Sequence, residues 1–212
     1  MTYSTRIGRS IALTVTASSL VAAALMTAAP AAEPISLAEA KAHLRVDASD
    51  EDALLNALIV AARMFIERNL GLALITQGWS YFLDFWPRSC CVTLPISPVE
   101  AVSAVKVHDG AGGFVDLDAD AYAIDVLSQP ARLVLRSAVP AVASRELNAF
   151  EIALTAGYGD EASDVPAPIR HALTLLVAHW FERREPVVLG VAPQEVPATI
   201  AGLLLPYRRV RL

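Results

Sequence analysis

The sequence is poor in residues that form disulfides or metal sites. Its two cysteines, Cys90 and Cys91, are adjacent, and a bridge between neighbours would strain the peptide bond that joins them. No histidine lies near them in the sequence, so a zinc site built from cysteine and histidine is not expected. We predict two free, partly buried thiols and no disulfide framework.

Patterns of catalysis and cofactor binding are also missing. His171 and His179 would lie about 12 Å apart along one helix, too far to share a metal without further ligands. The glycines of 109–113 and 156–160 match neither a phosphate loop nor a dinucleotide fingerprint, and no serine stands in a Gly-x-Ser-x-Gly motif. The aspartates of 116–125 lack the glycine and final glutamate of a calcium loop. We predict a protein that is not an enzyme, with no catalytic, cofactor-binding or metal-binding residues.

Charged residues are scarce and apolar residues abundant. The charged fraction is 18% and the hydrophobic fraction 55%, against roughly 25% and 45–50% in an average soluble domain. The net charge of -5 argues against a protein that coats nucleic acid. This composition allows a sizeable core and leaves apolar surface for partner proteins.

The first 33 residues have the pattern of a secretory signal. Arg6 and Arg9 precede an apolar run over 11–26, and small residues over 27–32 suit a cleavage site near Ala32. The run is short for a membrane span, which needs about 20 apolar residues. Three interpretations stay open: a cleaved signal, a start codon placed too far upstream, and a real N-terminal arm whose apolar stretch is buried against a partner.

The ordered pattern is expected to start at Pro34. Ser36 and Glu39 have the spacing of a capping box, which predicts a short helix through Leu44. A similar pair, Ser49 and Asp52, predicts the cap of a longer helix that ends at about Leu70. Apolar residues at steps of three and four give that helix a buried stripe, and its charged side chains are expected on the opposite, polar face. Those are Glu51, Asp52, Arg63, Glu67 and Arg68.

Strand patterns follow, and then a last helix. Alternating residues predict strands over 79–86, 92–94, 102–108, 114–117, 122–127, 132–136 and 150–155. Gly110, Gly112 and Gly113 favour a hairpin loop. The periodicity after Asp164 predicts a helix over 166–185, with Pro166 and Pro168 in its first turn, where a missing N–H costs little.

These elements predict an α+β fold. The N- and C-terminal helices pack as a small bundle, the central and mostly antiparallel β region is an excursion between them, and the C-terminal tail is extended. The chain divides into a signal-like segment or extension over 1–33, a main domain over 34–205 and a basic tail over 206–212. Within the main domain we expect helices in 36–70, the β region in 79–157 and a helix in 166–185.

Several segments together resemble the head–tail connector (adaptor) proteins of tailed phages, most closely the head–tail adaptor of bacterial gene transfer agents. Each motif is weak alone, but their order and spacing are specific, and the likeness covers about residues 35–212. The matching segments are Ile35–Lys41, Leu72–Trp79, Leu83–Pro87, Leu94–Val99, Ala156–Asp160, Val165–Ile169, Trp180–Glu185 and Tyr207–Leu212.

The resemblance implies a structural subunit of a homo-oligomeric ring, commonly of about twelve copies. Such a ring lies in the neck of the particle, assembled in the bacterial cytoplasm, between the portal protein and a stopper or tail-completion protein. Packaged DNA would pass through its lumen without sequence-specific contacts, and no membrane is involved. The resemblance also implies that the C-terminal segment reaches into the portal, with an apolar anchor and arginines that pair with portal carboxylates. The expected portal-binding residues are Leu203, Leu204, Leu205, Tyr207, Arg208, Arg209, Arg211 and Leu212.

Two functions of other classes remain as alternatives. An exported periplasmic binding domain would use the signal-like start, and cleavage near Ala32 would favour it. A small hydrolase would need a nucleophile and a base that the sequence does not bring together.

Overall fold

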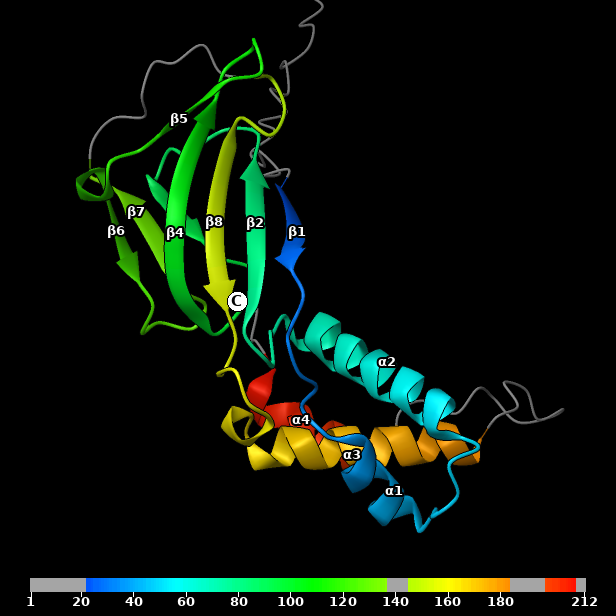
Figure 1. The fold of residues 1–212 in the computed structure, drawn as a ribbon. Helices are drawn as coiled ribbons and strands as arrows, with labels where there is room; N and C mark the ends of the chain where they lie inside the picture. Colours follow the sequence, from blue (N-terminus) through cyan, green and yellow to red (C-terminus); the bar gives the residue numbers. More distant parts are fainter. Residues whose placement is uncertain (1–21, 137–144, 184–196, 209–212) are drawn as a thin grey trace, which may run out of the picture.

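A computed structural model describes residues 22–136, 145–183 and 197–208. Two subregions meet end to end, a β sandwich and a helical layer (Figure 1). The sandwich is the excursion between the second and third helices that the sequence predicts. The predicted α+β fold with N- and C-terminal helices packed together is confirmed.

The helical layer has four helices among the described residues. Helix α1 (Leu37–Leu44) begins with the predicted capping box, in which Ser36 and Glu39 bond to each other's backbone N–H. Helix α2 (Asp52–Leu70) ends at Gly71, whose φ of 67° is the left-handed conformation typical of a C-terminal glycine. Helix α3 (Ala167–Glu182) packs against α1, α2 and α4 (Ala198–Leu204).

The predicted cap of α2 is wrong. Residue Glu51, not Ser49, occupies the N-cap position, and no side chain caps the helix. Asp52 is engaged elsewhere, because its carboxylate accepts a hydrogen bond of 2.6 Å from Lys41 Nζ on α1. A tertiary ion pair between helices thus takes the side chain that the local pattern assigned to the cap.

The sandwich consists of two antiparallel sheets. The larger sheet has the strand order β1-β2-β8-β4-β5 and the smaller one β3-β7-β6 (Figure 1). The strands are β1 (Ala22–Ala28), β2 (Gln77–Leu83), β3 (Cys91–Thr93), β4 (Val99–His108), β5 (Phe114–Asp116), β6 (Tyr122–Asp125), β7 (Arg132–Leu135) and β8 (Phe150–Ala156). All but β1 lie within a few residues of the strands that the alternation predicts.

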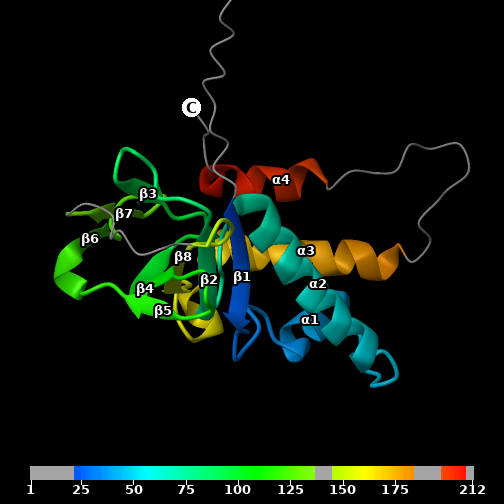
Figure 2. The ribbon, with the colours of Figure 1, turned by 90° about the horizontal axis from the view of Figure 1, so that it is seen from above.

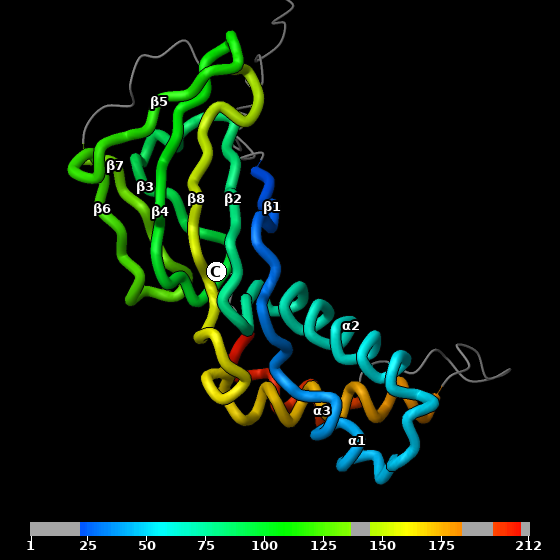
Figure 3. Tube along the Cα trace, in the orientation of Figure 1, coloured from blue at the N-terminus to red at the C-terminus, as the bar shows by residue number. Residues whose placement is uncertain are grey.

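Strand β1 is the largest difference from the sequence-based expectation. The pattern placed the first ordered element at Pro34, yet residues 22–28 pair antiparallel with β2 at the edge of the larger sheet. The strand then leads directly into α1, along the side of the molecule (Figure 3). Cleavage near Ala32 would remove this strand from the fold.

Each subregion has its own core, and residues 72–76, between α2 and β2, form one of the connections between them. Leu83, Val105 and Ile152 are fully buried in the sandwich, and Leu55, Ile66 and Leu173 in the helical layer. Residues 72–76 form backbone hydrogen bonds with Ser97 and with Tyr158 and Gly159. At this crossing Gly157 has a φ of +157°, and a Cβ there would lie 2.5 Å from the backbone nitrogen of Thr76. Only glycine fits where the two segments cross.

Candidate interaction surfaces

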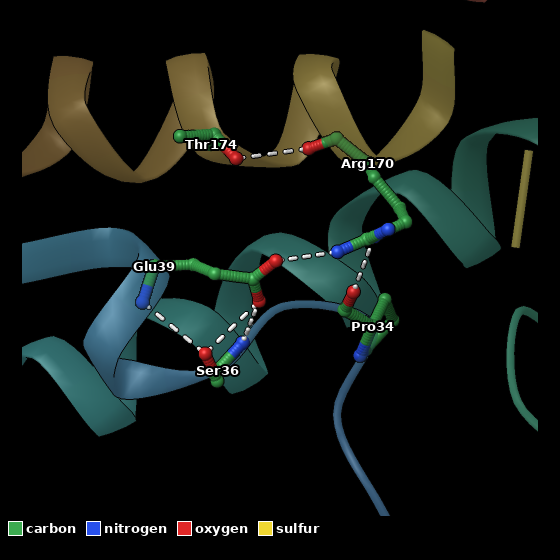
Figure 4. A network of polar contacts seen from close by, with 5 residues as sticks. All are labelled: Pro34, Ser36, Glu39, Arg170 and Thr174. Carbon is green, nitrogen blue, oxygen red and sulfur yellow. Dashed lines mark hydrogen bonds and ion pairs between the residues drawn. The ribbon is translucent and has the colours of Figure 1, made fainter. Parts of the chain in front are cut away.

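The chain at the start of α1 is held to α3 by a side-chain network. Figure 4 shows how Arg170 on α3 donates from Nε to the carbonyl oxygen of Pro34, at 3.1 Å, and also pairs with Glu39 on α1. Hydrogen bonds from the backbone N–H and hydroxyl of Ser36, together with the Arg170 guanidinium, hold the pKa of the Glu39 carboxyl below its ordinary value despite some desolvation. This network joins the start of α1 to α3.

A second, buried ion-pair network centres on Arg63 of α2. Arg63 on α2 donates from Nε to Glu33 and from Nη1 to Glu67, each at 2.8 Å. The other oxygen of Glu67 accepts from the backbone N–H of Leu74 at 2.9 Å and from Gln77 Nε2 at 2.6 Å. The Glu67 carboxylate thus connects α2 to residues 72–76 and to β2. Arg63 connects α2 to Glu33, just before α1.

This network corrects the expected polar face of α2. Arg63 and Glu67 were expected on the surface, but their relative exposures are only 6% and 8%. Desolvation lowers the pKa of Arg63, but the hydrogen bond to Glu33 and the charges of both carboxylates outweigh it, so the pKa lies above its ordinary value. The i,i+4 spacing of Arg63 and Glu67 was visible in the sequence, but the pattern gave no sign of their burial.

An apolar groove of about 640 Å³ opens beside this network. Ala24 and Met26 of β1 form one wall, and Met64 and Phe65 of α2 form another, with Trp180 of α3 beside Phe65. The ribbon views show β1 and the adjoining end of α2 side by side (Figures 1 and 2). Met64 is 55% exposed, so the groove presents apolar surface to solvent.

Strand β1 has only one paired edge among the described residues, the edge that faces β2. It carries no charge and no proline, and Leu25 is 60% exposed. Soluble proteins usually protect such an edge with charges, proline or covering chain, because unpaired backbone groups invite pairing with another chain. Strand β1 therefore carries both an unpaired edge and, through Ala24 and Met26, one wall of the groove.

The predicted portal-binding tail is only partly extended. Residues 198–207 form α4 and a short 3-10 helix (Leu205–Tyr207). Leu204 is buried at 7% exposure, and Leu203 and Tyr207 pack partly against the helical core. These three side chains anchor the tail to its own subunit. Leu205 and Arg208 are exposed, and Arg209, Arg211 and Leu212 lie outside the described residues.

The histidines and cysteines are dispersed. His108 contacts Glu151 at 3.0 Å on the open face of the larger sheet, whereas His171 and His179 lie on α3. Within the described ranges no three histidine, cysteine or acidic residues come close enough to hold a metal ion. Cys90 and Cys91 are both free thiols. No helix in the described part of the chain has the length and apolar character to cross a membrane.

The described residues thus present an apolar groove, an unpaired strand edge and an exposed Arg208 after the C-terminal helix. Residues 34–109 match the family model described as phage gp6-like head-tail connector protein. These residues run from the start of α1 to the end of β4. No curated protein sequence matches the chain.

Solved structures extend the likeness to most of the chain. It is similar to a chain in the neck of an empty gene transfer agent particle, computed with C6 symmetry, with 28% identity and a TM-score of 0.75 over 90% of this chain and 97% of that one. It is similar to a chain in the virion of a native gene transfer agent particle, with 27% identity and a TM-score of 0.75 over 89% and 96%. It is also similar to a chain in the neck of the native particle with C12 symmetry, with 27% identity and a TM-score of 0.68 over 89% and 97%.

These matches confirm the resemblance to the phage head–tail connector family. The particular likeness is to the neck of gene transfer agent particles. A span of 90% of the 212 residues is longer than the stretch from Pro34 to Leu212, so the structural match also includes part of the segment before Pro34.

Proposed function

We propose that this protein is a subunit of the head–tail connector ring in the neck of a gene transfer agent or tailed phage. The observation that carries the proposal is the fold match over nearly the full length of a neck chain, 97% of it. Since the matched necks have C6 and C12 symmetry, copies of this chain assemble into a cyclic ring. In this role the protein joins the portal protein to a stopper or tail-completion protein.

The charge of the chain suits a ring through which DNA passes. Its net charge of -5 has the same sign as the DNA phosphates, which disfavours bulk adhesion of DNA to the chain. In the proposed ring, DNA passes through the lumen without sequence-specific contacts.

The proposal is tested by assembly with a portal. We expect the purified chain, mixed with the portal protein encoded in the same genome, to form a ring on one end of the portal, visible by negative-stain imaging and countable by native mass spectrometry. A chain that neither forms a ring nor binds the portal under these conditions contradicts the proposed function.

The C-terminal arginines are proposed to make the portal contact. Tyr207 and Leu204 anchor α4 and the short 3-10 helix to the subunit, so the segment from Arg208 onward is the part left to reach a partner. An arginine can pair with a carboxylate through two hydrogen bonds, and a ring of tails multiplies weak single contacts.

Replacing Arg208, Arg209 and Arg211 together with glutamate is expected to weaken portal capture in a pull-down by at least about a hundredfold, because each attraction becomes a repulsion. The matched control reverses three other arginines exposed on the sandwich side, Arg88, Arg136 and Arg145. It changes the net charge by the same amount and should leave capture intact. Equal effects of the two triple variants would show that overall charge, not the tail, governs binding.

A further inference from the structure

A leucine on the loop after β6 is the most exposed large apolar side chain of the described residues. Leu127 has a relative exposure of 93%, and its neighbour Val126 is 40% exposed. Burying a leucine side chain contributes roughly 1.5–3 kcal/mol relative to leaving it in water. A leucine so fully exposed is therefore a candidate contact residue for another protein.

The loop that carries Leu127 is held in one shape. The Asp125 carboxylate accepts from the backbone N–H of Ser128 at 3.1 Å and from its hydroxyl at 2.6 Å. It also pairs with Arg132 Nη2 at 2.6 Å. These bonds lower the pKa of Asp125 well below its ordinary range, with the Ser128 hydroxyl contributing most. A turn fixed in advance loses little conformational entropy on binding.

The groove beside β1 offers apolar surface for such a side chain. Met26, Met64, Phe65 and Trp180 are among the residues that line it. Large, well-packed pockets that receive an apolar anchor are typical of interface hot spots. Its volume of about 640 Å³ exceeds the need of one leucine, so Val126 can enter with Leu127.

The loop and the groove lie on opposite sides of the molecule. In both ribbon views β6 is at one end of the sandwich, while β1 and α2 lie toward the other side (Figures 1 and 2). A cyclic ring requires two different, complementary patches on each subunit, so that every copy offers one patch and receives the other. The matched necks have such cyclic symmetry.

We infer that Leu127 of each subunit inserts into the groove lined by Met26, Met64, Phe65 and Trp180 of the next copy of this chain. This inference rests on the proposed ring and identifies the contact that closes it. The occupant of the groove is a second copy, and the interface is head-to-tail.

The test uses cysteine cross-linking in a Cys90→Ser, Cys91→Ser background. Leu127→Cys and Met64→Cys are combined in one chain, the ring is assembled on the portal protein, and a short bismaleimide is added. We expect a ladder of covalent oligomers up to the full ring, and no oligomer with either single variant. The matched control combines Met64→Cys with Leu147→Cys, a leucine of similar surface character at 65% exposure, and should give no ladder.

The outcomes separate the inference from the proposed function. A ring that forms normally but gives no ladder overturns the Leu127 contact and leaves the proposed function intact. Dimers from a single variant show a two-fold contact instead and overturn it too, as does a cross-link from Met64→Cys to the portal protein. If the unmodified chain forms no ring on the portal, both the proposed function and this inference fail.

Discussion

Replacing Arg63 with methionine is expected to lower the free energy of unfolding by about 3 kcal/mol, because it leaves the Glu67 carboxylate buried without its cationic partner. Glu67 keeps the N–H of Leu74 and the amide of Gln77, which reduces the loss but does not neutralise the charge. Urea denaturation monitored by tryptophan fluorescence would measure the change.

Two variants make this result specific. Arg68→Met alters an exposed arginine on the same helix and should change the unfolding free energy by no more than about 0.5 kcal/mol. The double variant Arg63→Met, Glu67→Gln removes the buried charge of Glu67 but keeps a side-chain oxygen that can accept from the N–H of Leu74 and the amide of Gln77. It should therefore recover most of the lost stability. If Arg63→Met were as mild as Arg68→Met, the network would have no structural importance.

Removing residues 1–33 is expected to destabilise the protein by about 2 kcal/mol more than removing residues 1–21 does. The longer deletion takes away β1, which pairs with β2 over residues 22–28, and Glu33, which pairs with Arg63. A loss of that size lowers the melting temperature of a domain of this length by roughly 4–8 °C.

The two deletions also distinguish the roles of the N-terminal segment. Without β1 the edge of β2 becomes exposed, so the longer deletion should aggregate at concentrations where the shorter one stays monodisperse in light scattering. Equal melting temperatures would mean that β1 is dispensable, and the interpretation of the segment as a removable leader would gain support. A lower melting temperature of the longer deletion would show that β1 stabilises the fold.

The sequence was sufficient to predict the elements that depend on local chemistry. The capping box of Ser36 and Glu39, the end of α2 at Leu70 and the start of α3 near Pro166 and Pro168 all agree with the structure. Each involves residues within a few positions of one another, so the sequence pattern states the interaction directly. The strands from β2 to β8 were found because alternation reflects one buried face.

The tertiary structure decided everything that depends on distant partners. Residues 22–28 read as part of a signal-like apolar run, and only the edge of β2 turns them into a strand. The sequence pattern predicts no helix between residue 185 and the basic tail, but α3 offers a surface that buries Ile200 and Leu204 and stabilises α4. A seven-residue helix is marginal in isolation, so packing and not propensity forms it.

The candidate surfaces also differ in whether the sequence alone reveals them. The basic tail was visible in the sequence because Arg208, Arg209 and Arg211 are close together. The groove was not, because its walls come from β1, α2 and α3, which are separated along the chain. Arg63 and Glu67 had the spacing of an ordinary exposed pair, and their burial follows from Glu33, Leu74 and Gln77 closing around them. The sequence alone determined which short segments form helices and strands, since neighbouring residues dictate these, while burial and surface shape required the fold that brings remote residues together.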